Sequence, residues 1–440
     1  MSVTRKHVLV LYWHEDPEER MRAAIHHHLR ALDNLTGADL EVVYCNVCHD
    51  TTTGLRHCRF DAILLHNTLL GLRWSHLFEL CKWRLRWVRD SNCAKIALPQ
   101  DEYDHSEILD EWLYEWGVAV IFTNFGSNHR QVLYPIMHDR ACFCGCFTGY
   151  VDESIAQRCA QKLLAAGVRP YDIVYRATHL PYWFGSHGQL KHQIAEVVAD
   201  RAKARGLRVD ISTRVEDTIV GDGWLDFLAS GRVVVGCESG SSVLDRRGEI
   251  RTRIQALLRR EEDLSFEEVR ERLPRGWDDY RFFAISPRHF EAIITKTCQV
   301  LVRGEYNGIL EADKHYIPLE SDFSNIDNVL ERICDKEHTQ AIAEQAYHHI
   351  YRHGDYSYRR FAADIQAALT TVSATRKTLP GNRSERIQKA TLRDYASSGW
   401  RAVSAMAHYY LYPGKAILNK PLKPFLNKCI QYWQGHDRQR

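Results

Sequence analysis

Residues 282–302 read FFAISPRHFEAIITKTCQVLV: an apolar run, a stretch with helical spacing and a second apolar run. The apolar runs at 282–285 and 299–302 predict two short strands, and residues 290–297 between them predict a helix. Two apolar strands joined by a helix indicate a parallel sheet, because the connecting helix covers one face of that sheet. This stretch therefore predicts an α/β fold.

The same alternation of apolar runs and helical stretches extends along most of the chain. Glycine and proline interrupt it near 150–170, which indicates a boundary. We expect two Rossmann-like lobes facing a cleft, the first over 1–165 and the second over 166–370 with a helical insertion at 246–280. Ligands of such sheets bind at the carboxyl ends of the strands. The other expected strands lie at 7–12, 40–44, 60–65, 95–98, 118–123, 171–175, 207–211, 233–236 and 316–318.

The composition is that of a globular protein, and the charge is uneven. Hydrophobic residues make up 45% of the 440 residues and charged residues 26%, which excludes a collagen-like or wholly disordered chain. The net charge of +2 hides a basic tail: residues 371–440 hold 13 Lys and Arg against 3 Asp and Glu, so the first 370 residues carry a net charge of −8. An acidic body and scattered basic residues argue against a nucleic-acid partner.

The tail, residues 371–440, combines its basic residues with aromatic ones. Basic side chains are attracted to anionic headgroups, and aromatic rings settle at the headgroup level. Three interpretations stay open: contact with an anionic membrane surface, docking on the acidic body, and disorder. The sequence has no apolar run long enough to span a membrane and no cleavable signal, so we expect a cytoplasmic protein, peripheral on the membrane if the tail binds it, with 13 reduced cysteines.

Residues 285–325, ISPRHFEAIITKTCQVLVRGEYNGILEADKHYIPLESDFSN, resemble the nucleotide-sugar-binding segment of GT-B glycosyltransferases, particularly the group-1 retaining type. The resemblance implies that Glu291, at the start of the expected helix, binds the nucleotide ribose. A carboxylate suits this role because it accepts hydrogen bonds from two hydroxyls at once. The turn Arg303-Gly304-Glu305-Tyr306 matches an acceptor-facing turn of the family, and we assign Tyr306 to the donor site.

The chain departs from the family pattern at a second glutamate, which the family usually carries eight residues before the ribose glutamate. This chain has Phe283 there. Glu238 is the candidate replacement because it also follows an apolar strand, and the insertion 246–280 would then separate the two acids. Ser239 and Gly240 join it in the expected donor site. The alternative is that this segment is a plain strand-to-helix turn.

A glycosyltransferase must stabilise a departing nucleoside diphosphate, and the resemblance implies an Arg/Lys pair for this purpose. Arg176 follows the expected strand at 171–175, and Lys191 lies fifteen residues further on. Gly185 permits close backbone approach ahead of Lys191, and a helix N-terminus there would also attract an anion. Arg288 is a third phosphate contact or a partner of Glu291. The alternative for Arg176 and Lys191 is two solvated surface charges.

Polar residues also follow strands of the first lobe. Asp101 and Glu102 come after the strand at 95–98, and either could act as a base on an acceptor hydroxyl. N-capping of the next helix is the alternative for this pair. His66, Asn67 and Asn124 occupy equivalent strand ends and predict an acceptor pocket of imidazole and amide groups.

We therefore expect a glycosyltransferase that moves a sugar from a nucleotide-sugar to a hydroxyl of a glycan or lipid-linked acceptor in cell-surface glycan synthesis, with retention of configuration. The resemblance implies no metal and no cofactor, because cationic side chains neutralise the leaving group. No Gly-rich dinucleotide or P-loop motif is present. The alternatives are a nucleotide-sugar epimerase or hydrolase on the same fold, and a non-catalytic nucleotide-sugar-binding protein.

Overall fold

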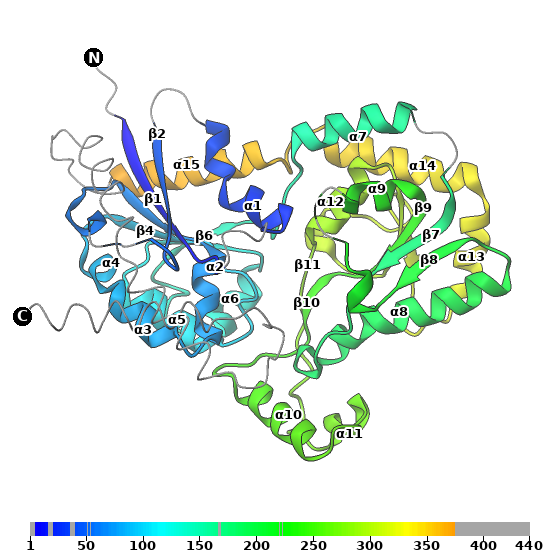
Figure 1. Cartoon of the computed structure of the whole chain (residues 1–440), viewed down its shortest axis with the longest axis horizontal. Coiled ribbons are helices and arrows are strands. Elements are labelled where there is room, and N and C mark those ends of the chain that lie inside the picture. Colours follow the sequence, from blue (N-terminus) through cyan, green and yellow to red (C-terminus); the bar gives the residue numbers. More distant parts are fainter. Residues whose placement is uncertain are drawn as a thin grey trace, which may run out of the picture.

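The computed structural model describes residues 5–15, 21–35, 40–50, 52, 54–165, 169–219, 221 and 223–374. Two α/β lobes lie side by side, each built on a parallel sheet (Figure 1). The two-lobed α/β fold expected from the sequence is confirmed. The basic tail lies outside the described residues, apart from its first four.

The first lobe is built on a six-stranded parallel sheet with the order β2-β1-β3-β4-β5-β6. Its central strands are buried on both faces, which explains why they read as continuous apolar runs. The sheet includes an edge strand, β6, that the alternation of the sequence did not predict. The strands are β1 (Lys6–Tyr12), β2 (Leu40–Asn46), β3 (Ala62–Leu65), β4 (Ala94–Ala97), β5 (Val120–Thr123) and β6 (Cys142–Gly145).

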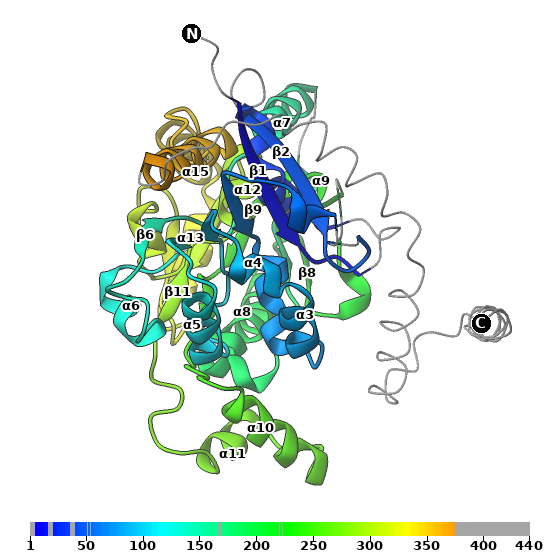
Figure 2. The same cartoon turned by 90° about the vertical axis from the view of Figure 1, so that its left-hand side faces the viewer.

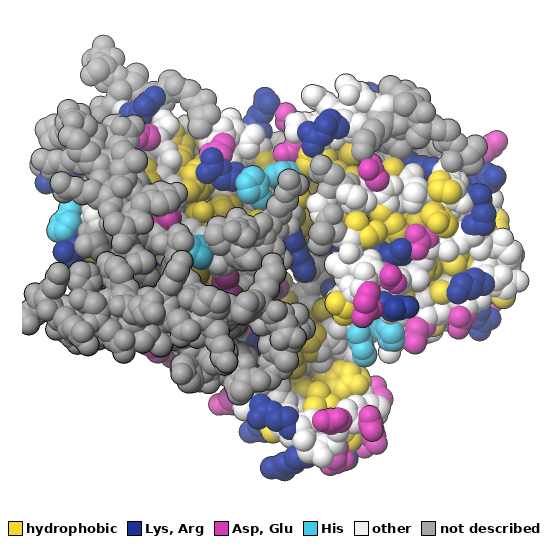
Figure 3. Space-filling view, viewed as in Figure 1, with side chains coloured by type: hydrophobic (Ala, Val, Ile, Leu, Met, Phe, Trp, Pro, Cys, Tyr) yellow, Lys and Arg dark blue, Asp and Glu magenta, His cyan; other side chains and the backbone are white. Residues whose placement is uncertain are grey.

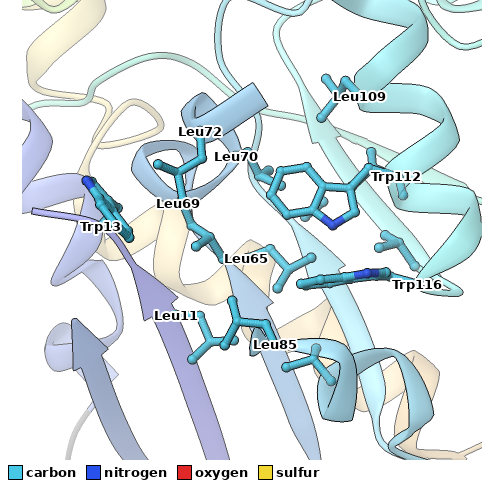
Figure 4. Packing of buried hydrophobic residues seen from close by; sticks show 14 of the residues in the cluster. Leu11, Trp13, Leu65, Leu69, Leu70, Leu72, Leu85, Leu109, Trp112 and Trp116 are labelled. Atoms are coloured by element: carbon cyan, nitrogen blue, oxygen red, sulfur yellow. The ribbon is translucent and has the colours of Figure 1, made fainter. Parts of the chain in front are cut away.

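Helices cover both faces of this sheet, and leucine and tryptophan side chains fill the space beneath them. Figure 4 shows Leu11 and Leu65 from the strands packed against Leu69, Trp112 and Trp116 from the helices. The helices that precede the junction between the lobes are α1 (Ala23–Leu29), α2 (Asn67–Leu70), α3 (Phe78–Arg84), α4 (Arg86–Asp90), α5 (Ser106–Glu115) and α6 (Ser127–Leu133). The 3-10 turns in the same part of the chain are η1 (Ala31–Leu35), η2 (Leu55–His57) and η3 (Gly71–Trp74).

The second lobe is built on a five-stranded parallel sheet with the order β13-β12-β9-β7-β8. Its strands are β7 (Tyr171–Arg176), β8 (Val209–Ser212), β9 (Gly231–Gly236), β12 (Cys298–Val302) and β13 (Ile317–Leu319). The helices and turns around it are η4 (Tyr182–Phe184), α8 (Gly185–Ala204), η5 (Val215–Asp217), α9 (Gly223–Ser230), α12 (Pro287–Ile294), η6 (Tyr306–Gly308), α13 (Ile326–Cys334), α14 (Lys336–Ala346) and the π-helical turn η7 (Tyr347–Tyr351).

The strand expected at 282–285 forms, but it does not join the main sheet. It is β11 (Phe282–Ala284), and it pairs antiparallel with β10 (Ser239–Ser241) in a separate two-stranded ribbon. Gly240 makes the pairing possible: its φ is +113°, and a Cβ there would lie 1.9 Å from the carbonyl oxygen of Phe282. The ribbon lies on the side of the second lobe that faces the first lobe (Figure 1).

At the junction of the lobes, two helices each pack on the lobe opposite to the one that the sequence predicted. Helix α7 (Glu153–Ala165) packs on the second lobe, where its Ala156 and Cys159 join a core with Phe290. Helix α15 (Tyr358–Ala374) returns to the first lobe and buries Phe361 against the central strands. The sequence prediction put residues up to 165 in the first lobe and residues up to 370 in the second. The structure differs because the apolar faces of these helices match the opposite cores (Figures 1 and 2).

The insertion at 246–280 forms two helices, α10 (Glu249–Arg260) and α11 (Phe266–Glu271), which project below the two lobes in Figure 1. Its apolar residues pack on η4 of the second lobe, and Figure 3 shows hydrophobic side chains gathered where the insertion meets that lobe. The start of the insertion and the residue before it contact the first lobe: Arg247 pairs with Glu107 at 3.0 Å, and the backbone of Asp245 forms a β-bridge with Asp104. The insertion therefore ties the two lobes together.

Candidate active site

A cavity of about 260 Å³ opens at the carboxyl end of the second sheet. Such volumes lie just below the roughly 300–1,000 Å³ of pockets for drug-sized ligands. One first-lobe residue, Arg22, contributes to the wall, so the cavity faces the cleft. The lining residues of the second lobe are Tyr175, Ala177, Thr178, Leu180, Lys191, Trp224, Leu228, Val234, Val235, Gly236, Cys237, Glu238, Ser239, Ser286, Arg288, His289, Gln299 and Leu301.

Besides Arg22 of the first lobe, two basic side chains of the second lobe line this cavity, and neither forms an ion pair with a described residue. Burial lowers the pKa of Lys191 in α8, and the nearby cation Arg288 lowers that pKa as well. Arg288, in the first turn of α12, donates to the backbone carbonyl of Arg176 at 2.6 Å. Two neighbouring cations without a carboxylate between them form a site that favours an anion.

The structure places the side chain of Arg176 away from this cavity. Its guanidinium forms an ion pair with Asp210 at 2.6 Å and lies 4.5 Å from the ring centre of Phe227. The sequence pairs Arg176 with Lys191, whereas the structure brings Arg288 next to Lys191 instead. The sequence suggested Arg288 as a third phosphate contact or as a partner of Glu291, and the structure places it beside Lys191.

The N-terminus of α8 already holds a carboxylate of the chain itself. Both carboxylate oxygens of Asp278, at the end of the insertion, accept from the backbone N–H of Ser186, at 2.9 and 3.1 Å. Gly185 has a φ of +70°, and a Cβ there would lie 2.0 Å from Asp278 Oδ1. The glycine therefore permits the approach of Asp278, and a ligand anion would meet this carboxylate at the helix start.

Glu238 lines the cavity and is held by the turn that follows β12. Its Oε1 accepts from the backbone N–H of Tyr306 at 2.7 Å, and burial raises its pKa. A Cβ on Gly304 would lie 2.3 Å from Glu238 Oε2, so only glycine permits this approach. The side chain of Tyr306 lies in the core, where its hydroxyl donates to the Val302 carbonyl. Tyr306 therefore positions Glu238 through its backbone, and its ring does not line the cavity.

Glu291 lies on α12 beside the cavity wall. Its Oε2 accepts from the indole Nε1–H of Trp224 at 2.7 Å, and burial raises its pKa. Trp224, from α9, lines the cavity, and the guanidinium of Arg288 lies 4.9 Å from the centre of its ring. The structure thus brings Glu291 and Arg288 to one indole at the rim. Trp224 was not identified from the sequence, where it reads as one apolar residue of a short helix.

The segments that follow strands β9 and β11, which the sequence placed in the donor site, meet at the cavity. Ser239 lines it, and Gly240 lies in the ribbon next to it. Cys237 also lines it, and burial raises the pKa of its thiol to about 11, so this thiol is protonated at neutral pH. His289 lines it as well, and burial lowers its pKa to about 4, so its imidazole is neutral.

In the first lobe, Asp101 and Glu102 have opposite surroundings. Asp101 is exposed, has a φ of +48° and lies close enough to Lys191 for its negative charge to raise the pKa of that lysine. Glu102 is fully buried and accepts from Thr123 at 2.6 Å and from the hydroxyl of Tyr134. Asp101 therefore faces the cleft, whereas the carboxylate of Glu102 is buried inside the lobe and does not line the cavity.

The three residues of the expected acceptor pocket are buried, and they differ in their hydrogen bonds. His66 is fully buried, and its ring nitrogens contact His28 at 3.2 Å and Thr68 at 3.0 Å, so it caps α2 and does not face the cleft. Asn67 and Asn124 are buried, and the side-chain oxygen of each has no hydrogen-bond partner among the described residues. None of these three residues lines the cavity.

Within the described part of the chain, no group of three or more His, Cys, Asp or Glu residues is arranged to hold a metal ion. The described helices include none long and apolar enough to cross a bilayer.

Two parallel sheets covered by helices, a helix exchange at the junction and a cavity at the carboxyl end of the second sheet define the GT-B class of fold. Solved structures with similarity include HepE of Anabaena with UDP and glucose, at 12% identity over 83% of this chain and 100% of that chain (TM-score 0.42). A glycosyltransferase of Rickettsia africae has 12% identity over 84% of this chain and 98% of its own (TM-score 0.40). An α1,3-fucosyltransferase has 11% identity over 84% and 92% (TM-score 0.39).

No family model matches the sequence, and no curated protein matches it. At such identities and TM-scores, the fold class rests on the sheets and helices of this chain itself, and the activity rests on its own residues.

Proposed function

We propose that this protein is a glycosyltransferase that moves a sugar from a nucleotide-sugar to a hydroxyl acceptor. One observation carries the proposal: Lys191 and Arg288 share a cavity at the carboxyl end of the second sheet, and neither forms an ion pair with a carboxylate of the described residues. A diphosphate would relieve their mutual repulsion and accept their hydrogen bonds. The negative charge that develops on the diphosphate as the glycosidic bond breaks would be stabilised further.

The other groups of the cavity support the remaining parts of such a donor. Glu238 is fixed by the turn at 304–306 and offers a carboxylate to sugar hydroxyls. Glu291 and the indole of Trp224 suit the ribose and its surroundings at the rim. Asp101 faces Lys191 from the first lobe and could orient or deprotonate the acceptor hydroxyl. In this proposal Lys191 and Arg288 supply the positive charge, and no metal is required.

The direct test is binding followed by turnover. A ligand at about 100 times its dissociation constant stabilises the folded state by about 2.7 kcal/mol, so a thermal-shift screen of nucleotide-sugars identifies the donor. We expect the chosen donor to be consumed only when an acceptor hydroxyl is present, with or without EDTA. Consumption without acceptor would instead indicate an epimerase or hydrolase, and binding without consumption would indicate a binding protein. Product NMR reads the anomeric configuration, which we propose is retained.

We also propose that the tail leads the protein to an anionic membrane surface, where a lipid-linked or cell-surface glycan is the acceptor. Helix α15 ends at Ala374 and packs on the first lobe, so a chain ending at Ala374 keeps this helix intact. The full-length protein should sediment with anionic liposomes at low salt and be released at high salt, whereas the shortened chain should stay in solution. Equal sedimentation of both chains, or of neither, would exclude this role.

A further inference from the structure

Gln299 is a polar residue within the apolar strand β12, and its side chain lines the cavity. It is 3% exposed, and its Nε2 has no hydrogen-bond partner among the described residues. Gln299 lies opposite Val234 of β9, and Val234 packs with Leu228 of α9 and Ala292 of α12. An amide therefore lies between the sheet and two helices, in a wall that is otherwise apolar.

A buried amide nitrogen without a partner costs folding free energy, because it loses its hydrogen bonds to water and gains none. A leucine or valine at position 299 would fit the strand pattern CQVLV and carry no such cost. The amide is therefore placed where the fold does not need it. A deeply buried side chain in a cavity wall whose amide nitrogen is unpaired is suited to a ligand.

The position of Gln299 within the cavity indicates which part of a ligand it meets. Lys191 lies beyond the carboxyl ends of the strands, whereas Gln299 precedes Leu301 on β12 and lies deeper, between the sheet and the helices. The indole of Trp224 forms another wall of the same cavity, and its bond to Glu291 fixes its orientation. An aromatic wall and an amide with adjacent donor and acceptor suit a flat heterocycle with a hydrogen-bonding edge.

We propose that Gln299 reads the edge of the nucleobase and so decides which nucleotide the site accepts. The inference rests on the proposed function, since it places the diphosphate at Lys191 and Arg288 and the base at Gln299. The amide can donate to a carbonyl oxygen of the base and accept from a neighbouring N–H group. A base that lacks this match leaves the buried amide unpaired and binds more weakly.

The test is calorimetric titration of the full chain with UDP, CDP, GDP and ADP. We expect the natural chain to prefer one nucleotide by at least about tenfold, and Gln299→Leu to lose this preference while binding inorganic pyrophosphate unchanged. Gln299→Glu can only accept hydrogen bonds when ionised, so its ranking should shift away from UDP and toward CDP, ADP and GDP, whose bases carry an amino group. An unchanged ranking in both variants would overturn the role of Gln299.

Gln189 provides the matched control, because it is equally buried but fully paired. Its amide donates to the Leu180 carbonyl at 3.1 Å and contacts His179 at 2.9 Å. Without ligand, Gln189→Leu should lower the melting temperature, whereas Gln299→Leu should keep or raise it; a lowered value for Gln299→Leu would assign this residue a structural role. Nucleotide binding with an unchanged ranking leaves the transferase proposal intact, whereas no nucleotide binding by the natural chain overturns both proposals.

Discussion

Replacing Lys191 by alanine is expected to lower turnover about 100-fold, which corresponds to roughly 2.7 kcal/mol of transition-state stabilisation. The ammonium group lines the cavity beside Arg288 and forms no ion pair with a described residue, so its charge is available to the departing diphosphate. The change removes a cation that burial disfavours, and we therefore expect no loss of folding stability. The measurement is steady-state kinetics with the donor found by the thermal-shift screen.

Arg176→Ala is the matched comparison for this prediction. Its guanidinium is bound to Asp210 at 2.6 Å and does not line the cavity, so its removal should lower turnover less than the removal of Lys191. Arg288→Ala should resemble Lys191→Ala because Arg288 lines the same wall. A larger loss in Arg176→Ala than in Lys191→Ala would return the leaving-group role to the pair that the sequence suggested.

Glu102→Ala is expected to lower the free energy of unfolding by about 3 kcal/mol. The carboxylate accepts from Thr123, from the hydroxyl of Tyr134 and from the backbone of Asn124, and all three groups lose their partner. Removing one member of a buried charged network costs roughly 3–5 kcal/mol. We expect the lower end, because the nearby guanidinium of Arg73 keeps its bonds to backbone carbonyls. Urea unfolding at neutral pH measures the change.

The pH dependence of stability provides the control for Glu102. Burial raises the pKa of Glu102 to about 7, above its ordinary value near 4.5, although its hydrogen bonds act in the opposite direction. The folded state therefore binds the proton more tightly than the unfolded state, and this contribution to stability falls as the pH rises from about 4.5 to 7. Glu102→Gln should remove that fall, which is on the order of 3 kcal/mol, and keep full activity. Lost activity in a stable Glu102→Gln protein would restore a catalytic role.

The core strands of both lobes could be predicted from the sequence because buried parallel strands read as apolar runs. The edge strand β6 was missed because its residues, from Cys142 to Gly145, are partly exposed and carry no such run. Residues 282–285 were predicted as a strand of the main sheet, and only the backbone of Gly240 reveals the separate ribbon. Pairing of this kind depends on a close approach between distant segments, which local pattern does not encode.

For the site residues, the sequence predicted correctly which ones follow a strand. It did not predict which of their side chains are buried or where they point. Lys191, Glu238 and Arg288 follow strands or open helices, and the structure brings all three to one cavity. Glu102 and His66 also follow strands, yet both are fully buried and bonded within the first lobe. The end of a strand says which edge of the sheet a residue occupies, and it does not say whether its side chain points to the cleft or to the core.

The sequence by itself determined the α/β class, the two lobes and the carboxyl ends of their strands as the place for a ligand, because apolar periodicity reports burial along each element. Only the tertiary structure decided the exchange of α7 and α15 between the lobes, the capping of α8 by Asp278, and the pairing of Lys191 with Arg288 in place of Arg176. These features join residues that lie far apart in the chain. Packing and charge in three dimensions decide which of these residues meet. A sequence read one segment at a time does not reveal these pairings.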